Sequence, residues 1–276
     1  MSLTDAVVAH YGRGDLLARI EAALRESGKD PELPTIDDLA GVDEFHSRGR
    51  EATRELADLL PSALDTELLD VGSGIGGPAR FLAATRGYRV AGVDLTPEYV
   101  EVANELARRC GLADRVRFLA GDALALPFAD ASFAAAYTQH VAMNIADKAG
   151  LYRELARVLR PGATLVIHDI LQGSGGPLRY PAPWSADGST SFLLDRAGLE
   201  RHLDQAGFAV AEVQERRQES VAWFEARMAA TRAGGGPSPL SVRLLLGPVF
   251  AEAFDNLIAD LREQRAIPTF VRAMRR

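Results

Sequence analysis

The sequence predicts an α/β fold built on a doubly wound, seven-stranded, mostly parallel sheet. Short apolar runs alternate with amphipathic helical patterns through the middle of the chain, which is how parallel strands connected by helices look in a sequence. A glycine-rich segment joins the first run to the first helix, and Pro161 with Gly162 separates a later helix from its following strand. With 276 residues, 47% of them hydrophobic, the chain is long enough for one sizeable core with additions.

The seven expected strands are short apolar runs, each next to a turn or a helical pattern. They occupy residues 67–71, 88–93, 115–119, 132–137, 163–169, 208–213 and 267–274. Apolar residues recur at helical spacing between most of these runs, and they predict helices over residues 78–86, 97–110, 151–159 and 195–207.

The two ends of the chain differ from this alternating core. Residues 3–26 have helical apolar spacing, and a second helix is expected to begin near Arg48. Helical patterns also fill the stretch before the last strand. We therefore predict a helical lid at residues 1–60, a core at 61–215 and 266–276, and a helical cap insertion at 216–265.

Composition excludes several classes of partner. The net charge of −7 gives no basic footprint for nucleic acid, and we find no apolar run of the ~20 residues that a membrane helix needs. The single cysteine, Cys110, predicts a reducing, cytoplasmic location. We expect no metal site, because the five histidines lack the close spacing of ligands such as H-x-x-x-H.

The most informative segment is LLDVGSGIGG, where a strand ends at Asp70 and glycines follow at positions 72, 74 and 76 before a helix. Glycine is needed where a backbone turns sharply and approaches a ligand closely. Such a loop either cradles a pyrophosphate, as in dinucleotide-binding proteins, or passes close to a nucleoside that carries no phosphate.

Two further carboxylates follow the next two predicted strands. Asp94 lies 24 residues beyond Asp70, where a carboxylate can accept both hydrogen bonds of a ribose diol. Asp122 follows the third strand at the same edge and can accept from an adenine amino group. Each is an ordinary loop or capping residue when taken alone, but the ordered series of three favours a nucleoside site.

Four ordered segments, DVGSGIGG, GVDLTPEYV, GDALALPF and YTQHVAMNI, resemble the successive motifs of class I S-adenosylmethionine-dependent methyltransferases. The resemblance covers roughly residues 44–215. It implies a Rossmann-like fold, S-adenosyl-L-methionine as the cofactor and S-adenosyl-L-homocysteine as the product. A cationic sulfonium ligand agrees with a loop that has acidic neighbours and no lysine.

The resemblance also assigns roles to the motif residues. It implies that Gly72, Gly74 and Gly76 accommodate the methionine and ribose parts of the cofactor. Asp70 would orient the loop and the cofactor's amino group.

At the nucleoside end, the resemblance implies that Asp94 holds the ribose hydroxyls and that Leu95 packs on adenine. Asp122 and Ala123 would contact the adenine edge, and Gln139 is expected to hold the methionine end.

The segment EFHSRGREAT resembles the N-terminal motif of small-molecule members, such as phosphoethanolamine and sarcosine/dimethylglycine methyltransferases. By this match Phe45, His46 and Ser47 would border the cofactor, and the upstream YGRGD, residues 11–15, would fold over it.

The catalytic candidates are His140 and Asn144, in the loop after the fourth strand. Active sites of open parallel sheets gather at the carboxyl ends of the strands. His140 is the candidate base or orienting group. Phosphoethanolamine-type relatives carry a histidine where this chain has Asn144, and asparagine can orient an acceptor but cannot act as a base.

Several alternatives remain at the level of the sequence. The acceptor is expected to be a small molecule with an apolar portion, because Trp184, Trp223, Phe224 and Met228 come from segments that would cover the cleft. Its nucleophile is nitrogen, oxygen or carbon. The oligomeric state also stays open, with a homodimer as one alternative. A nicotinamide-dependent (NAD-dependent) oxidoreductase and a catalytically silent nucleoside-binding module are the competing interpretations.

Overall fold

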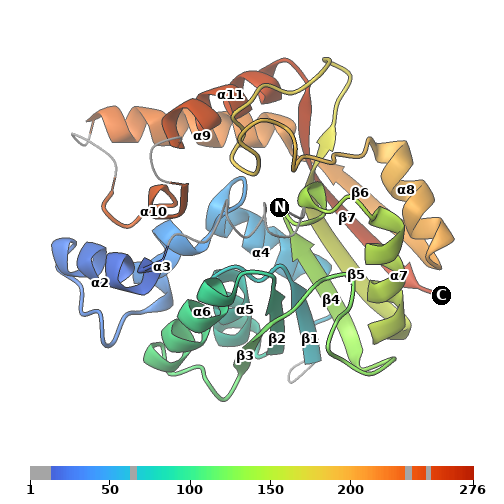
Figure 1. The fold of residues 1–276 in the computed structure, drawn as a ribbon, viewed down its shortest axis with the longest axis horizontal. Helices are drawn as coiled ribbons and strands as arrows, with labels where there is room; N and C mark the ends of the chain where they lie inside the picture. The colour runs from blue at the N-terminus through green and yellow to red at the C-terminus, as the bar shows by residue number, and fades with distance from the viewer. Residues whose placement is uncertain (1–13, 63–66, 234–237, 247–249) are drawn as a thin grey trace.

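The computed structural model describes residues 14–62, 67–233, 238–246 and 250–276 and shows one seven-stranded sheet (Figure 1). The strand order is β3-β2-β1-β4-β5-β7-β6, and only β7 runs antiparallel to its neighbours. This confirms the predicted fold. The strands are β1 (Glu67–Val71), β2 (Arg89–Asp94), β3 (Val116–Ala120), β4 (Phe133–Gln139), β5 (Leu159–Gln172), β6 (Phe208–Glu215) and β7 (Ala266–Arg275).

Helices cover both faces of the sheet, because alternate residues of each central strand point to opposite sides. Leu69 and Ala136 belong to the apolar core on the side of α7 and α8, whereas their neighbours Leu68 and Ala135 belong to the core on the side of α4, α5 and α6. The helices of these two layers are α4 (Gly49–Leu59), α5 (Gly77–Arg86), α6 (Pro97–Arg109), α7 (Lys148–Val158) and α8 (Arg196–Gln205).

The remaining helices lie at the carboxyl edge of the sheet, where Figure 1 shows α9 and α11 above the strands. They confirm helices in the described part of the entry segment and in the insertion before the last strand. Residues 3–13 of the predicted entry segment, with the first three residues of YGRGD, lie outside the described residues. The helices at this edge are α2 (Leu16–Glu26), α3 (Ile36–Asp43), α9 (Arg217–Ala233), α10 (Arg243–Leu246) and α11 (Phe250–Arg262). The division into lid, core and cap at residues 60, 216 and 265 stays our interpretation.

One helix, α3, was not expected from the sequence. It begins at a capping box, in which the side chain of Thr35 accepts from the backbone N–H of Asp38 and the Asp38 carboxylate accepts in return. The strand β5 also begins at Leu159, four residues earlier than the predicted Ala163.

An apolar cluster joins the two ends of the chain. Leu245 of α10 packs with Leu16 and Leu39, from α2 and α3, and with Ile75 and Tyr99 of the core. The inserted turn at α10 is therefore held by the N-terminal helices. In the described part of the chain, every helix is too short or too polar to cross a membrane.

Candidate functional site

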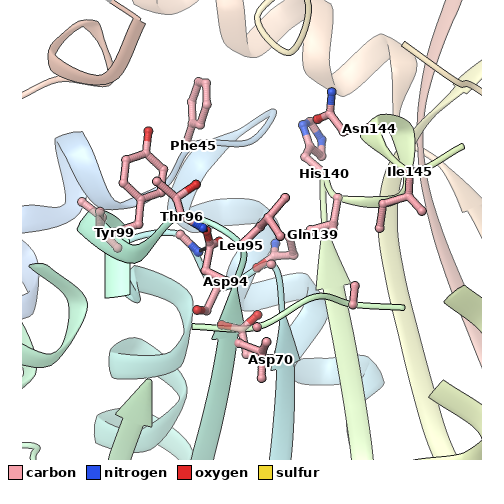
Figure 2. Close-up of a pocket in the computed structure, with 18 of the residues that line it drawn as sticks. Phe45, Asp70, Asp94, Leu95, Thr96, Tyr99, Gln139, His140, Asn144 and Ile145 are labelled. Carbon is pink, nitrogen blue, oxygen red and sulfur yellow. Dashed lines mark hydrogen bonds between the residues drawn. The ribbon is translucent and has the colours of Figure 1, made fainter. Parts of the chain in front are cut away.

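A cavity of about 350 Å³ opens at the carboxyl ends of β1, β2 and β4, and we call it the loop cavity (Figure 2). Figure 2 shows Asp70 and Asp94 at its lower end, with Phe45 and His140 on opposite sides of its upper end. Of the predicted site residues, those that line it are Phe45, His46, Asp70, Gly72, Gly74, Asp94, Leu95, Asp122, Ala123, Gln139, His140 and Asn144.

The glycine loop has three glycines with different surroundings. At Gly72, with φ of 77°, a Cβ atom would lie 2.2 Å from a methyl carbon of Val141. Gly74, with φ of 53°, has no heavy atom within 4 Å of such a position and lines the cavity. Gly76 does not line the cavity, because it packs on the ring of Phe118, 2.4 Å from where its Cβ would be.

Asp94 fixes this loop from the neighbouring strand. Its Oδ2 accepts from the backbone N–H of Gly74 at 2.8 Å, and its Oδ1 accepts from the N–H of Thr96 at 2.9 Å. Burial raises the pKa of Asp94, and these two bonds oppose the rise. The carboxylate is thus held in one orientation at the cavity.

Asp70 lies under the same loop and is fully buried. Its Oδ2 accepts from the Tyr137 hydroxyl at 2.7 Å. Burial raises the pKa of Asp70 to about 7; the Tyr137 bond lowers it, and the charge of Asp94 raises it. Two adjacent carboxyl groups with raised pKa values favour a ligand that brings positive charge.

Some buried polar atoms of the cavity wall are left unsatisfied by the protein itself. Among the described residues, Ser73 Oγ and Gln139 Oε1 have no hydrogen-bond partner, although both side chains line the loop cavity. Buried polar groups nearly always have a hydrogen-bond partner, so each of these two unpaired atoms requires an explanation. A hydroxyl and an amide oxygen beside two carboxylates fit a ligand with an ammonium group and sugar hydroxyls, which are features of S-adenosylmethionine.

Asp122 lies at the rim of the cavity and is exposed. Its Oδ1 accepts from the backbone N–H of Leu124 at 2.9 Å, in a local turn. Leu95 and Ala123 line the same end of the cavity and are half-buried. This end combines apolar side chains with one carboxylate at the edge.

A second cavity, of about 670 Å³, lies beneath α9 and α11, and we call it the cap cavity. Ser47, which the sequence assigned to the cofactor, lines this cavity and not the loop cavity. Phe45, His46 and His140 line both. The two cavities therefore meet at these three side chains.

His140 has an unusual backbone at this junction. Its φ is 56°, which is uncommon for a residue other than glycine. Its N–H donates to the carbonyl of His168 at 2.7 Å, and its Nε2 lies 3.3 Å from Ser47 Oγ. Burial, with a smaller contribution from His46, holds the pKa of His140 well below its usual value, so the imidazole is neutral.

Glu44 organises the other side of the junction and was not predicted. Its carboxylate accepts from Arg50 Nε at 2.5 Å and from Thr53 Oγ1 at 2.7 Å, and it lies 3.1 Å from His46 Nε2. Burial acts to raise the pKa of Glu44, but these partners outweigh it and hold that pKa below its ordinary value. The only signal in the sequence was the pattern E-x-H at positions 44 and 46, which is too common to be informative.

Asn144 is a buried residue of the loop after β4. Its Nδ2 donates to the carbonyls of Trp184 at 2.9 Å and Thr190 at 2.8 Å. Its amide hydrogens therefore position the segment that carries Trp184, and its contact with an acceptor stays a prediction.

The imidazoles of His46, His140 and His168 are neighbours, with ring centroids 4.8 to 6.0 Å apart. In the part of the chain that the structure describes, no group of three histidine, cysteine or acidic residues is arranged to hold a metal ion.

Comparison with known proteins agrees with this geometry. Residues 69–167 match the family described as methyltransferase domain. The methyltransferase GfsG of Streptomyces halstedii is 38% identical over 134 residues, which are 49% of this chain and 48% of that protein. These findings confirm the resemblance seen in the motifs. The chain spans about half the length of the curated relatives it matches.

Solved structures show the same fold. The phosphoethanolamine N-methyltransferase 2 of Haemonchus contortus, in complex with S-adenosyl-L-methionine, is 20% identical with a TM-score of 0.72, over 100% of this chain and 60% of its own. The cyclase SpnF is 21% identical with a TM-score of 0.69, over 100% of this chain and 97% of its own. One fold thus serves a protein named as a methyltransferase and one named as a cyclase.

Proposed function

We propose, on the premise that residues 69–167 form a methyltransferase domain, that this chain uses S-adenosyl-L-methionine to methylate a small molecule and releases S-adenosyl-L-homocysteine. The observation that carries the proposal is the junction of the two cavities. A cofactor in the loop cavity and an acceptor in the cap cavity would meet only at Phe45, His46 and His140.

The residues of the loop cavity suit the cofactor. Asp70 and Gln139 would hold the ammonium end, and Asp94 the ribose hydroxyls. Leu95 and Asp122 would hold the adenine. The bound cofactor supplies a methyl group on a positively charged sulphur, which is already activated for transfer.

The protein's own contribution is therefore alignment, exclusion of water and the movement of one proton. Neutral His140 can accept a proton at a ring nitrogen, and Ser47 beside Nε2 orients that ring. Asn144 would act on the acceptor indirectly, by holding the segment of Trp184, which lines the cap cavity. For an acceptor that needs no base, His140 would instead orient the nucleophile.

Two other functions make different predictions. A nicotinamide-dependent oxidoreductase would bind NAD, but the short, evenly spaced glycines and the acidic residue after the third strand, Asp122, disfavour it. A catalytically silent module would bind the nucleoside without turnover, and the fold alone does not exclude this because the fold is shared with a cyclase.

Calorimetry separates these candidates. We expect S-adenosylhomocysteine to bind with one site per chain and NAD to show no saturable heat. Binding of NAD in preference to S-adenosylhomocysteine would remove the proposal. A methylation screen against cell metabolites, read as formation of S-adenosylhomocysteine, then distinguishes an enzyme from a silent module.

The location of the protein in the cell and its oligomeric state are also matters for proposal. A cytoplasmic location agrees with the single cysteine, Cys110. A homodimer is tested by light scattering of the purified chain, where a monomer mass at all concentrations would contradict it.

A further inference from the structure

Resting on the proposed function, we infer that the acceptor is an uncharged, largely apolar molecule, and that only its nucleophile-bearing end is polar. The inference rests on how apolar and polar side chains are distributed around the cap cavity. Its buried wall is largely apolar and aromatic, whereas its polar side chains, apart from the buried Ser241, are concentrated near the junction with the loop cavity or at exposed positions.

The apolar wall is built by three segments that are distant in the sequence. Trp184 comes from the loop after β5, Trp223 and Phe224 from α9, and Leu257 and Ile258 from α11. Trp184, Phe224, Leu257 and Ile258 are buried. Trp223 packs edge-on against Phe224, with ring centroids 5.0 Å apart. These contacts preform a concave apolar surface, which is how sites for small molecules are usually built.

The size of the cavity also argues against a very small acceptor. At about 670 Å³ the cap cavity is larger than the loop cavity of about 350 Å³, and it falls within the range of pockets for drug-sized ligands. A compact acceptor such as an amino acid would leave most of the apolar wall without a partner.

The charged groups at the junction are already neutralised within the protein. Arg48 makes two bonds to the Glu55 carboxylate, at 2.9 and 2.5 Å, and Arg50 donates to Glu44. A charged acceptor at this end would have to displace one of these pairs, because an uncompensated buried charge is costly.

Three further arginines line the cap cavity, but all three are exposed to solvent. They are Arg54, Arg227 and Arg232. Arg227 lies over the ring of Trp223 at 4.8 Å and extends the aromatic surface. Water screens exposed charges, so these arginines do not offset the apolar character of the buried wall.

Intrinsic tryptophan fluorescence can detect ligand binding in the cap cavity. The chain contains two tryptophans, Trp184 and Trp223, and both line the cap cavity. Intrinsic tryptophan fluorescence therefore reports on this site without a label. The variants W184F and W223F assign the signal to either ring.

The experiment titrates the wild-type chain, saturated with S-adenosylhomocysteine, with two sets of probes. One set is uncharged and apolar: geraniol, 4-hexylphenol and testosterone span a chain, one ring and fused rings. The other set is charged and compact: phosphoethanolamine and sarcosine. We expect a saturable change in fluorescence with at least one apolar probe and none with either charged probe.

A matched pair of variants tests the wall itself. Met228 lines the cap cavity, and its neighbour Ala229 is exposed on α9 outside it. M228E should weaken binding of the apolar probe at least about tenfold, because a charge enters the apolar wall. A229E adds the same charge to the same helix and should leave binding unchanged. Both variants should bind S-adenosylhomocysteine as the wild type does.

The results of these experiments distinguish an error in the proposed function from an error in the inference on the acceptor. If the wild type does not bind S-adenosylhomocysteine, the proposed function is wrong. If it binds that nucleoside but responds only to phosphoethanolamine or sarcosine, or to none of the apolar probes, the inference on the acceptor is wrong. Equal weakening by M228E and A229E would also overturn it.

Discussion

The hydroxyl of Tyr137 donates to the buried carboxylate of Asp70 at 2.7 Å, under the glycine loop. Tyr137 comes from β4 and Asp70 from β1, two strands that pair in parallel with these residues opposite each other. The bond opposes the effect of burial on Asp70, whose pKa is nevertheless raised to about 7. The charge state of Asp70 therefore changes near neutral pH.

The affinity for S-adenosylhomocysteine should consequently depend on pH. The ammonium group of this ligand favours ionised Asp70, whereas the free protein binds a proton there below about pH 7. Binding must then release that proton, so affinity should fall by up to about tenfold for each pH unit below 7 and level off above it. Calorimetry between about pH 5.5 and pH 8 measures this.

The D70N variant provides the control for this prediction. It should bind more weakly at the upper end of the range and lose most of the pH dependence, since the titrating group is gone. If the affinity of D70N for S-adenosylhomocysteine fell with pH as steeply as that of the wild type, the pH dependence would come from another group.

Two glycines of the loop should respond differently to alanine. In G72A the new Cβ meets Val141 at 2.2 Å, so we expect a loss of about 1–3 kcal/mol in the free energy of unfolding. In G74A the Cβ enters open space at the cavity, so unfolding should change by only about 1 kcal/mol from the backbone strain.

G74A should weaken ligand binding although it has little effect on stability. Its Cβ occupies part of the loop cavity, so affinity for S-adenosylhomocysteine should fall roughly tenfold or more. Chemical denaturation and calorimetry measure the two effects. A stable G74A variant with unchanged affinity would show that the ligand does not approach this backbone.

His140 can be tested with asparagine, which tolerates its left-handed backbone better than most residues. H140N removes the imidazole at the junction and should reduce turnover by about 10²- to 10⁴-fold, if the acceptor requires a base. Affinity for S-adenosylhomocysteine should stay within about threefold of the wild type. Unchanged turnover of the true acceptor would remove His140 from the mechanism.

Neutralising Glu44 should destabilise the chain. E44Q leaves Arg50 without its buried countercharge, and we expect a loss on the order of 3 kcal/mol in the free energy of unfolding. Thermal and chemical denaturation measure this. The exposed Glu51, on the adjoining helix, is the matched control, and E51Q should change stability by less than about 0.5 kcal/mol. Equal effects of the two variants would contradict a structural role for the buried carboxylate.

The fold and the floor of the loop cavity were predictable because their signals are local. A glycine series directly after a strand, and an aspartate at the end of the next one, indicate a site at one sheet edge whatever the rest of the chain does. Gly76 shows the limit of such a pattern: it follows the same spacing, but it serves packing on Phe118.

The junction and the cap were less predictable because their contacts join distant residues. Asn144 bonds to carbonyls 40 and 46 residues further along the chain, and Arg216 reaches Glu55 across 161 residues. Helical spacing placed α9 and α11 in the insertion, but it carries no information on which segment they face. The short helix α3 was missed because only its capping box marked it.

The short segment at α10 borders both cavities. Leu245 lines the loop cavity, whereas Ser241 and Val242, just before α10, line the cap cavity. A change in this short segment would therefore alter the walls of both cavities at once.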